Sequence, residues 1–157
     1  SITHGTIFRR AIEEKLIDST AMFQIGLRAT GYSSEDFDWA RGHGVEVIPA
    51  EECWYQSLTP LMIDIRNKLG PDRPVYLSFD IDGLDPSVAP GTGTPEPAGL
   101  QTSQGLEIIR GLFGLNIVGG DLVEVCPPYD PSGNTALLAA NLIFEMLCSF
   151  PGCKRGS

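Results

Sequence analysis

A run of apolar and aromatic residues that ends in three aspartates constrains this chain more than any other feature. Residues 75–79 predict a buried strand, and Asp80, Asp82 and Asp85 follow it into a loop rich in proline and glycine. Because side chains alternate along a strand, we expect Asp80 and Asp82 to project to the same side. Two carboxylates at the end of a buried strand repel each other and are costly to desolvate unless a cation compensates them. Oxygen ligands favour Mg²⁺, Ca²⁺ or Mn²⁺, so the pattern predicts a metal site.

The aspartates also suggest two other kinds of loop. A short Asp-x-Asp motif also occurs in solvated acidic turns, and the aspartates alone leave that alternative open. An EF-hand loop requires glycine at its sixth position and glutamate at its twelfth. Counted from Asp80, the fourth position is Gly83 and the twelfth is Gly91, and a strand rather than a helix precedes the motif. The EF-hand is therefore excluded.

Predicted strands and helices alternate along the chain. The expected strands cover residues 22–27, 45–48, 75–80 and 116–124. The expected helices cover residues 6–14, 34–41, 57–69, 102–112 and 134–150, with Ser33 or Ser34 capping the second and Thr102 or Ser103 the fourth. This order is typical of an α/β fold with three layers, in which a parallel sheet lies between two layers of helices. Ligands bind at the carboxyl ends of such strands, where Asp80, Asp82 and Glu124 fall.

Length and charge narrow the class of protein. The 157 residues suffice for one domain, which we expect to cover residues 1–150, with a short tail at 151–157. A net charge of −9 argues against a nucleic-acid partner, which needs a basic face. It weakly favours a cationic substrate, and an acidic charge that simply aids solubility is an equal alternative. The longest apolar stretch is interrupted by Asn141 and Glu145, so no membrane-spanning segment is predicted.

The cysteines form no Cys-x-x-Cys pair and no zinc spacing. We expect four free thiols, mostly buried, in a reducing compartment. They are Cys53, Cys126, Cys148 and Cys153.

The aspartate motif belongs to a longer string that resembles a known family. In residues 80–95, Asp-x-Asp-x-x-Asp-Pro runs into Ala-Pro-Gly-x-Gly-Thr-Pro, which is similar to the third signature of the ureohydrolases (arginases, agmatinases and related amidinohydrolases). Residues 4–9, 24–28, 120–125 and 134–137 resemble the agmatinase branch, and residues 138–147 are most similar to animal agmatinases. The resemblance extends over essentially the whole chain and implies an arginase-like fold.

Two earlier signatures of that family, Gly-Gly-Asp-His-Ser and Asp-Ala-His-x-Asp, do not occur in this sequence. In the family they supply the other four metal ligands, so the chain resembles the C-terminal half of a longer protein. In the family's sheet, the strand that carries the second absent signature lies between two strands that this chain retains. We therefore expect a gap in the sheet, with open strand edges and exposed apolar surface.

The resemblance implies an enzyme of polyamine biosynthesis that hydrolyses agmatine to putrescine and urea with two Mn²⁺ ions. Asp80 and Asp82 match two of the family's metal ligands. Glu124 matches the glutamate that binds the substrate guanidinium, and a carboxylate at a strand end can accept paired hydrogen bonds from that planar cation. A buried glutamate paired with an arginine has the same pattern and remains an alternative.

Further residues match supporting roles in the family. His4 matches a histidine that acts as general acid or base towards the leaving amine, although a histidine near a chain end is also typical of a solvated loop. We expect Asp85, which precedes a proline, to order the loop behind the ligands through backbone hydrogen bonds. The glycine-rich residues 91–94 are expected to form a wall of the active site. His43 has no motif and is predicted to be an exposed loop residue.

Alternatives remain for the function. Another guanidino compound, such as a guanidino acid, is an alternative substrate, and a non-catalytic fragment with an interaction role is an alternative from another class. The resemblance implies a small cationic guanidino substrate and a homo-oligomer when the protein is full length. It also implies an intracellular location, mitochondrial as in animal agmatinases and otherwise cytoplasmic.

Overall fold

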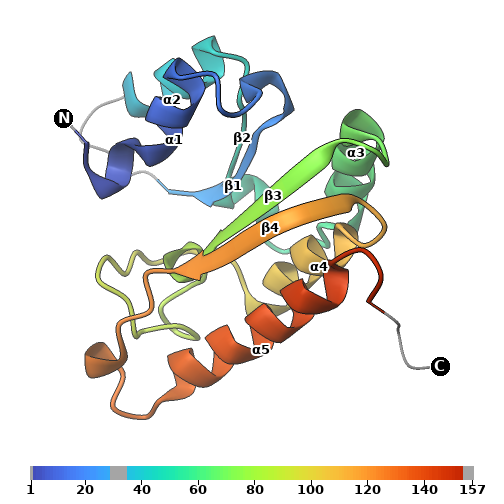
Figure 1. The fold of residues 1–157 in the computed structure, drawn as a ribbon. Helices are drawn as coiled ribbons and strands as arrows, with labels where there is room; N and C mark the ends of the chain where they lie inside the picture. Colours follow the sequence, from blue (N-terminus) through green and yellow to red (C-terminus); the bar gives the residue numbers. More distant parts are fainter. Residues whose placement is uncertain (1, 29–34, 154–157) are drawn as a thin grey trace.

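The computed structural model describes residues 2–28 and 35–153, in which strands and helices alternate as predicted (Figure 1). The strands are β1 (Phe23–Leu27), β2 (Glu46–Pro49), β3 (Pro74–Asp80) and β4 (Asn116–Val123). The helices are α1 (Ile7–Glu13), α2 (Glu35–Gly42), α3 (Thr59–Leu69), α4 (Thr102–Gly111) and α5 (Asn134–Ser149). Every predicted element is present, and the ends differ by at most two residues. The predicted cap at Ser33 or Ser34 lies outside the described residues.

The four strands form two separate parallel sheets. One sheet pairs β1 with β2, and the other pairs β3 with β4 over the whole length of β3, from Pro74 opposite Asn116 to Asp80 opposite Val123. The parallel pairing agrees with the predicted α/β class. The division into two sheets agrees with the expected gap, because a strand that would join them is not among those described.

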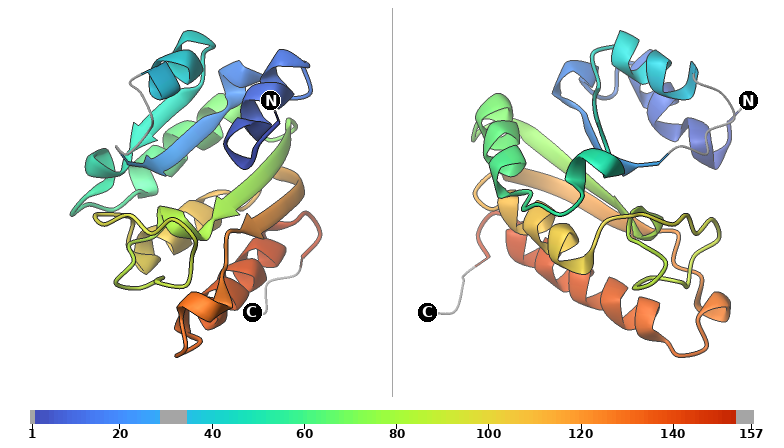
Figure 2. Two further views of the ribbon diagram at one scale, coloured as in Figure 1. Left: turned by 90° about the vertical axis from the view of Figure 1, so that its left-hand side faces the viewer. Right: turned by 180° about the vertical axis from the view of Figure 1, so that it is seen from behind.

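Helices lie on both sides of the strands. In Figures 1 and 2, α1 and α2 lie on one side of the strands, whereas α3, α4 and α5 lie on the other. A single apolar core extends from Ile48 and Cys53, next to β1 and β2, to Ile109 and Leu142 on α4 and α5. The two sheets are therefore held together by shared side-chain packing rather than by backbone pairing.

One face of the β3–β4 sheet carries no helix in the described part of the chain. Side chains alternate as they must in strands, so Phe79 and Ile117 are buried, whereas Tyr76 and Val118 are 57% and 59% exposed. Exposed apolar residues also lie along α5, namely Leu137, Ile143, Phe144 and Leu147. The exposed apolar surface that the sequence predicted is thus present on this sheet face and on α5.

Two details differ from the sequence prediction. The residue that caps α4 is Gln101 rather than Thr102 or Ser103, and its backbone N–H donates to Oε1 of Gln104 at 3.0 Å. This cap forms because the Gln104 side chain is buried and reaches both the cap and the Gln56 carbonyl oxygen. All four cysteines are free thiols, as predicted, but only Cys53 is buried.

The loop at residues 84–100 is anchored to the start of α5. The Gly91 N–H donates to Oγ1 of Thr135 at 2.9 Å, and the Thr135 hydroxyl and N–H both donate to the Asp130 carboxylate at 2.7 Å. Hydrogen bonds from Ser132 and then from Thr135 lower the pKa of Asp130 to about 2. Only glycine fits at position 91, because a Cβ atom there would lie 2.9 Å from the Cβ atoms of Asp130 and Thr135.

Replacing Thr135 with valine preserves its shape but removes the hydroxyl that links Gly91 to Asp130. Because a buried donor and a buried acceptor then each lose a partner, we expect the free energy of unfolding to fall by about 1–3 kcal/mol. Thr59→Val, at an exposed position, is the matched control and should change it by less than about 0.5 kcal/mol. Denaturant unfolding of both variants measures the difference, and equal effects would show that the link does not anchor the loop.

Candidate functional site

Asp80 is the last residue of β3, and a short 3-10 turn, Ile81–Gly83, follows it directly. The Asp82 N–H donates to Oδ1 of Asp80 at 3.1 Å, which caps the turn, and Ile81 is fully buried beneath it. Asp82 is therefore not part of the strand, so the alternation argument for the pair was wrong. The two carboxyl groups nevertheless face each other, because the turn rather than the strand brings them together.

The charge at this turn is uncompensated. Although Asp80 is exposed at the surface, desolvation of its carboxylate, followed by repulsion from Asp82 and then from Glu124, raises its pKa from 3.8 to about 7. A carboxyl group with such a pKa is mostly protonated below pH 7 unless a cation lies nearby. The electrostatics at the end of β3 therefore favour a positively charged ligand.

Asp82 is also held through its side chain. Its Oδ2 accepts a hydrogen bond from the Thr94 hydroxyl at 2.9 Å, and Asp82 is half-buried. Within residues 91–94, Gly91 packs against α5, whereas a Cβ atom added at Gly93 would meet open space. The glycine-rich segment thus lies against Asp82, and Thr94 provides the contact, a role that sequence reasoning did not assign to it.

Asp85 closes the loop that follows the turn. Its carboxylate accepts hydrogen bonds from the N–H groups of Ser87 at 2.9 Å and Gly99 at 3.1 Å. The hydrogen bonds from Ser87 contribute most to lowering the pKa of Asp85. Asp85 and Asp80 therefore lie in opposite environments, because the first is surrounded by donors and the second by other carboxylates.

Glu124 directly follows β4, at a φ of +65° that ends the strand. Pairing of β3 with β4 puts Asp80 opposite Val123, so Glu124 lies next to the aspartates. Its side chain is exposed and forms no ion pair among the described residues, so the alternative of a buried glutamate paired with an arginine is wrong. The carboxylate is free to accept hydrogen bonds from a ligand.

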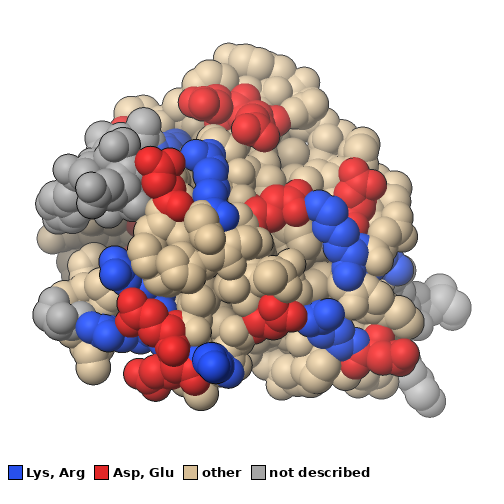
Figure 3. All heavy atoms as spheres, turned by 90° about the horizontal axis from the view of Figure 1, so that it is seen from above, with Lys and Arg blue, Asp and Glu red and all other residues tan. Residues whose placement is uncertain are grey.

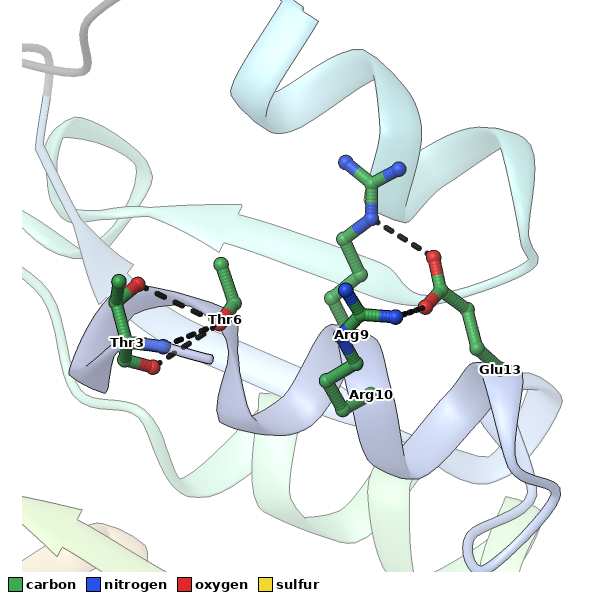
Figure 4. Close-up of polar contacts among 5 residues, drawn as sticks. All are labelled: Thr3, Thr6, Arg9, Arg10 and Glu13. Atoms are coloured by element: carbon green, nitrogen blue, oxygen red, sulfur yellow. Dashed lines mark hydrogen bonds and ion pairs between the residues drawn. The ribbon is translucent and has the colours of Figure 1, made fainter. Parts of the chain in front are cut away.

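His4 lies in an exposed 3-10 turn, His4–Thr6, just before α1. Figure 4 shows how Thr3 and Thr6 brace this turn: the Thr3 N–H donates to Oγ1 of Thr6 at 2.9 Å, and that hydroxyl donates back to the Thr3 carbonyl at 3.0 Å. In the part of the chain that is described, no hydrogen bond or ion pair joins His4 to the aspartates. His4 is thus not hydrogen-bonded to the other candidate residues in the described part of the chain, and its role stays a prediction.

His43 is exposed, as predicted, and stacks on Trp39 with 4.0 Å between the ring centroids. The guanidinium of Arg9 also lies over the Trp39 ring, 4.7 Å from its centroid. This cluster joins α1 to α2. It serves packing between two helices rather than the candidate site.

Arg28 is a residue of the site that sequence reasoning missed. It directly follows β1, and its guanidinium donates to the carbonyl oxygens of Asp82 at 2.6 Å and Gly83 at 3.2 Å. Two signals in the sequence could have found it, namely its place in residues 24–28, which resemble the agmatinase branch, and its position at the carboxyl end of a predicted strand. Such ends gather at one edge of an α/β fold.

The donor set fits a hard divalent cation in part. Asp80 and Asp82 provide carboxylate oxygens beside one another, which is the ligand type that Mn²⁺ and Mg²⁺ prefer. Over residues 2–28 and 35–153, however, no group of three or more His, Cys, Asp and Glu side chains is arranged to hold a metal ion. Two ligands of a metal site therefore fit here, and a complete site needs more.

On the face shown in Figure 3, acidic and basic side chains are interspersed and no extended basic patch appears. In the described part of the chain, no helix has both the length and the apolar character needed to cross a bilayer.

Comparison with known proteins places this geometry in a family. Residues 1–148 match the model of the Arginase family. The chain is 62% identical over 154 residues to the guanidinobutyrase of Pseudomonas aeruginosa and 61% identical over 153 residues to the mitochondrial agmatinase of Gallus gallus. Each alignment covers 98% of this chain, but only 48% and 45% of the respective relative.

The fold gives the same result. A solved structure of the proclavaminate amidino hydrolase from Streptomyces clavuligerus superposes with a TM-score of 0.87 at 46% identity, covering 94% of this chain and 48% of that one. The chain thus spans about half the length of the relatives it matches. Because the match extends over nearly all of its residues in both sequence and fold, the chain belongs to the arginase family.

Proposed function

We propose that this chain is the part of a ureohydrolase that provides two metal ligands and the guanidinium-binding carboxylate. The proposal rests on one observation, which is that Asp80, Asp82 and Glu124 lie near one another at the carboxyl ends of β3 and β4. The reaction is hydrolysis of a C–N bond of a guanidino compound, which releases urea and an amine. Relatives of about twice the length support this reaction class.

In this proposal, Asp80 and Asp82 hold manganese together with ligands from the missing half of the domain. When bound, Mn²⁺ lowers the pKa of a coordinated water, so that a nucleophile is available at neutral pH. Asp80 would hold the cation through a carboxylate whose ionisation is otherwise opposed by desolvation and by repulsion from Asp82. Asp85 orders the loop behind the two ligands through its bonds to Ser87 and Gly99.

The remaining roles concern the substrate. Glu124, which is exposed and has no ion-pair partner among the described residues, accepts hydrogen bonds from the planar guanidinium and orients its carbon. His4 gives a proton to the leaving amine, a role that requires the missing half to complete the cleft beside it. The homo-oligomer and the mitochondrial location belong to the same proposal, and the mitochondrial relative in Gallus gallus supports the location alone.

Agmatine is the first candidate substrate. Agmatine carries two positive charges, and the net charge of −9 and the acidic strand ends favour such a cation. A guanidino acid is the second candidate, favoured by the 62% identity to a guanidinobutyrase. Both candidates share the guanidinium, which Glu124 would bind, and differ in the group at the other end.

A chimera distinguishes the two substrates. In it, this chain replaces the matching half of the Pseudomonas aeruginosa guanidinobutyrase, so that the first half of the domain is restored. Urea release is measured with agmatine and with 4-guanidinobutyrate as separate substrates. Turnover of either one supports the reaction class, and the higher kcat/KM identifies the substrate. If a chimera that is folded and loaded with manganese releases urea from neither agmatine nor 4-guanidinobutyrate, the proposed reaction is wrong and the chain is a non-catalytic fragment.

Substitutions in the chimera test the individual roles. We expect Asp80→Ala or Asp82→Ala to abolish urea release and to lower the manganese content, because each removes a ligand. Glu124→Gln should retain the metal and lower kcat/KM by about 10–100-fold, since a charge-assisted hydrogen bond to the guanidinium is lost. Metal analysis of the Glu124 variant is the control, and a large loss of manganese would make that residue a ligand instead.

The isolated 157-residue chain should release no urea. Two ligands leave most coordination positions to water, so we expect weak Mn²⁺ binding and no rigid site for the nucleophile. The open strand edges should also favour self-association. The assay adds Mn²⁺ and agmatine to the purified chain and follows urea alongside the chimera. Turnover by the isolated chain at the rate of the chimera would refute the need for the other half.

The pKa of Asp80 predicts how the stability of the metal-free chain depends on pH. Its pKa is raised in the folded state, so between about pH 4 and pH 7 the folded chain holds a proton that the unfolded chain releases. The contribution of the Asp80 carboxyl group to the free energy of unfolding is therefore fully present below pH 4, and it is lost as the pH rises through 7. Asp80→Asn removes the unfavourable ionised carboxylate, so we expect the free energy of unfolding to rise at pH 8. The rise should be only about 1 kcal/mol, because solvent screens this carboxylate.

Asp85→Asn is the matched control for that variant. The pKa of Asp85 is lowered by its donors, so neutralising this carboxylate should reduce stability at pH 8 rather than increase it. Urea unfolding of both variants in the presence of EDTA, at pH 4 and pH 8, measures the two effects. Shifts of the same sign at pH 8 would contradict the opposite environments assigned to the two aspartates.

A further inference from the structure

Arg28 joins three segments that the two sheets leave separate. Its guanidinium donates to four backbone carbonyl oxygens, those of Gly26 at 3.1 Å, Gly83 at 3.2 Å, Asp82 at 2.6 Å and Glu96 at 2.8 Å. These acceptors belong to β1, to the turn after β3 and to the loop at residues 84–100. No backbone ladder joins β1 to β3, so this one side chain provides polar contacts across the gap.

The surroundings of Arg28 cost free energy, which a side chain that only fills space would not need to incur. Arg28 is half-buried, pairs with no carboxylate in the described part of the chain, and its Nε is buried with no acceptor there. Burying a charge and leaving a donor unsatisfied both cost free energy. A planar fork that reaches several carbonyl oxygens at once is something only arginine provides, and a lysine is a point charge with different geometry.

The consequence concerns Asp82, which is restrained at three points. Its N–H is bound by Asp80, its carboxylate by Thr94 and its carbonyl by Arg28. The carbonyl contact fixes the peptide plane between Asp82 and Gly83, and with it the direction of the Asp82 side chain. Among these three contacts, that of Arg28 alone comes from the other sheet.

We propose that Arg28 is a positioning residue for the candidate metal site. By holding the carbonyl groups of Asp82 and Gly83 it directs the Asp82 carboxylate, and by holding that of Glu96 it sets the loop that carries Thr94. Arg28 acts through Asp82 and touches no reacting group. The identity of the metal rests on the proposed function, whereas the restraint on the backbone does not.

Hydrogen exchange in the 157-residue chain tests the restraint without any metal. The reporters are the amides of Leu100, which donates to the Gly83 carbonyl, and of Asp85, which donates to the Leu100 carbonyl. We expect Arg28→Lys and Arg28→Met to speed exchange at these amides by about 10-fold or more, with the amides of the β3–β4 ladder unchanged. Arg73→Lys, at an exposed residue paired with Asp18, is the control. No change, or uniform acceleration along the chain, would overturn the proposal.

Manganese binding in the chimera tests the link to the site. We expect Arg28→Lys to raise the dissociation constant for Mn²⁺ by about 10–100-fold, as is typical for residues that orient a ligand, while Arg73→Lys leaves it unchanged. If the wild-type chimera is active and Arg28→Lys binds Mn²⁺ as tightly, the positioning role is wrong. If the wild-type chimera neither binds Mn²⁺ nor releases urea, the proposed function fails, and the exchange experiment still decides the role of Arg28.

Discussion

The parallel pairing of β3 with β4 is the constraint on which the candidate site depends. It places Asp80 opposite Val123 and so brings Glu124 beside the two aspartates, although the two segments are far apart in the sequence. Parallel neighbours require a crossover, and here α4 provides it and packs with α5 against one face of the sheet. The carboxylates gather at one edge because both strands end there.

The environments of the carboxylates separate those that stabilise the chain from those available for a ligand. Asp85 and Asp130 are surrounded by N–H and O–H donors, so their pKa values are lowered. Asp80 faces other carboxylates and is partly desolvated, so its pKa is raised to about 7. A folded chain tolerates the first arrangement at no cost, whereas the second remains unfavourable until a cation binds.

The two-sheet architecture reflects a domain of which this chain is about half by comparison with its relatives. One face of β3–β4 lies open and displays Tyr76 and Val118, and the strands of different sheets share no hydrogen bonds. Packing through the common core and the contacts of Arg28 hold the halves of the fold in place. Open strand edges and exposed apolar surface of this kind favour association with other protein.

The sequence by itself determined the order and the ends of the elements, the parallel class of the sheets and the position of the aspartates at a strand end, because these follow from local periodicity and from a long signature. Tertiary structure alone decided that a 3-10 turn rather than the strand brings Asp82 to Asp80, that Glu124 is exposed, and that Arg28 holds the turn. The turn is a local feature that strand periodicity does not reveal, whereas the exposure of Glu124 and the contacts of Arg28 depend on how distant parts of the chain pack. Local patterns carry no information about such contacts, since backbone carbonyls accept hydrogen bonds from any side chain that the packing brings within reach.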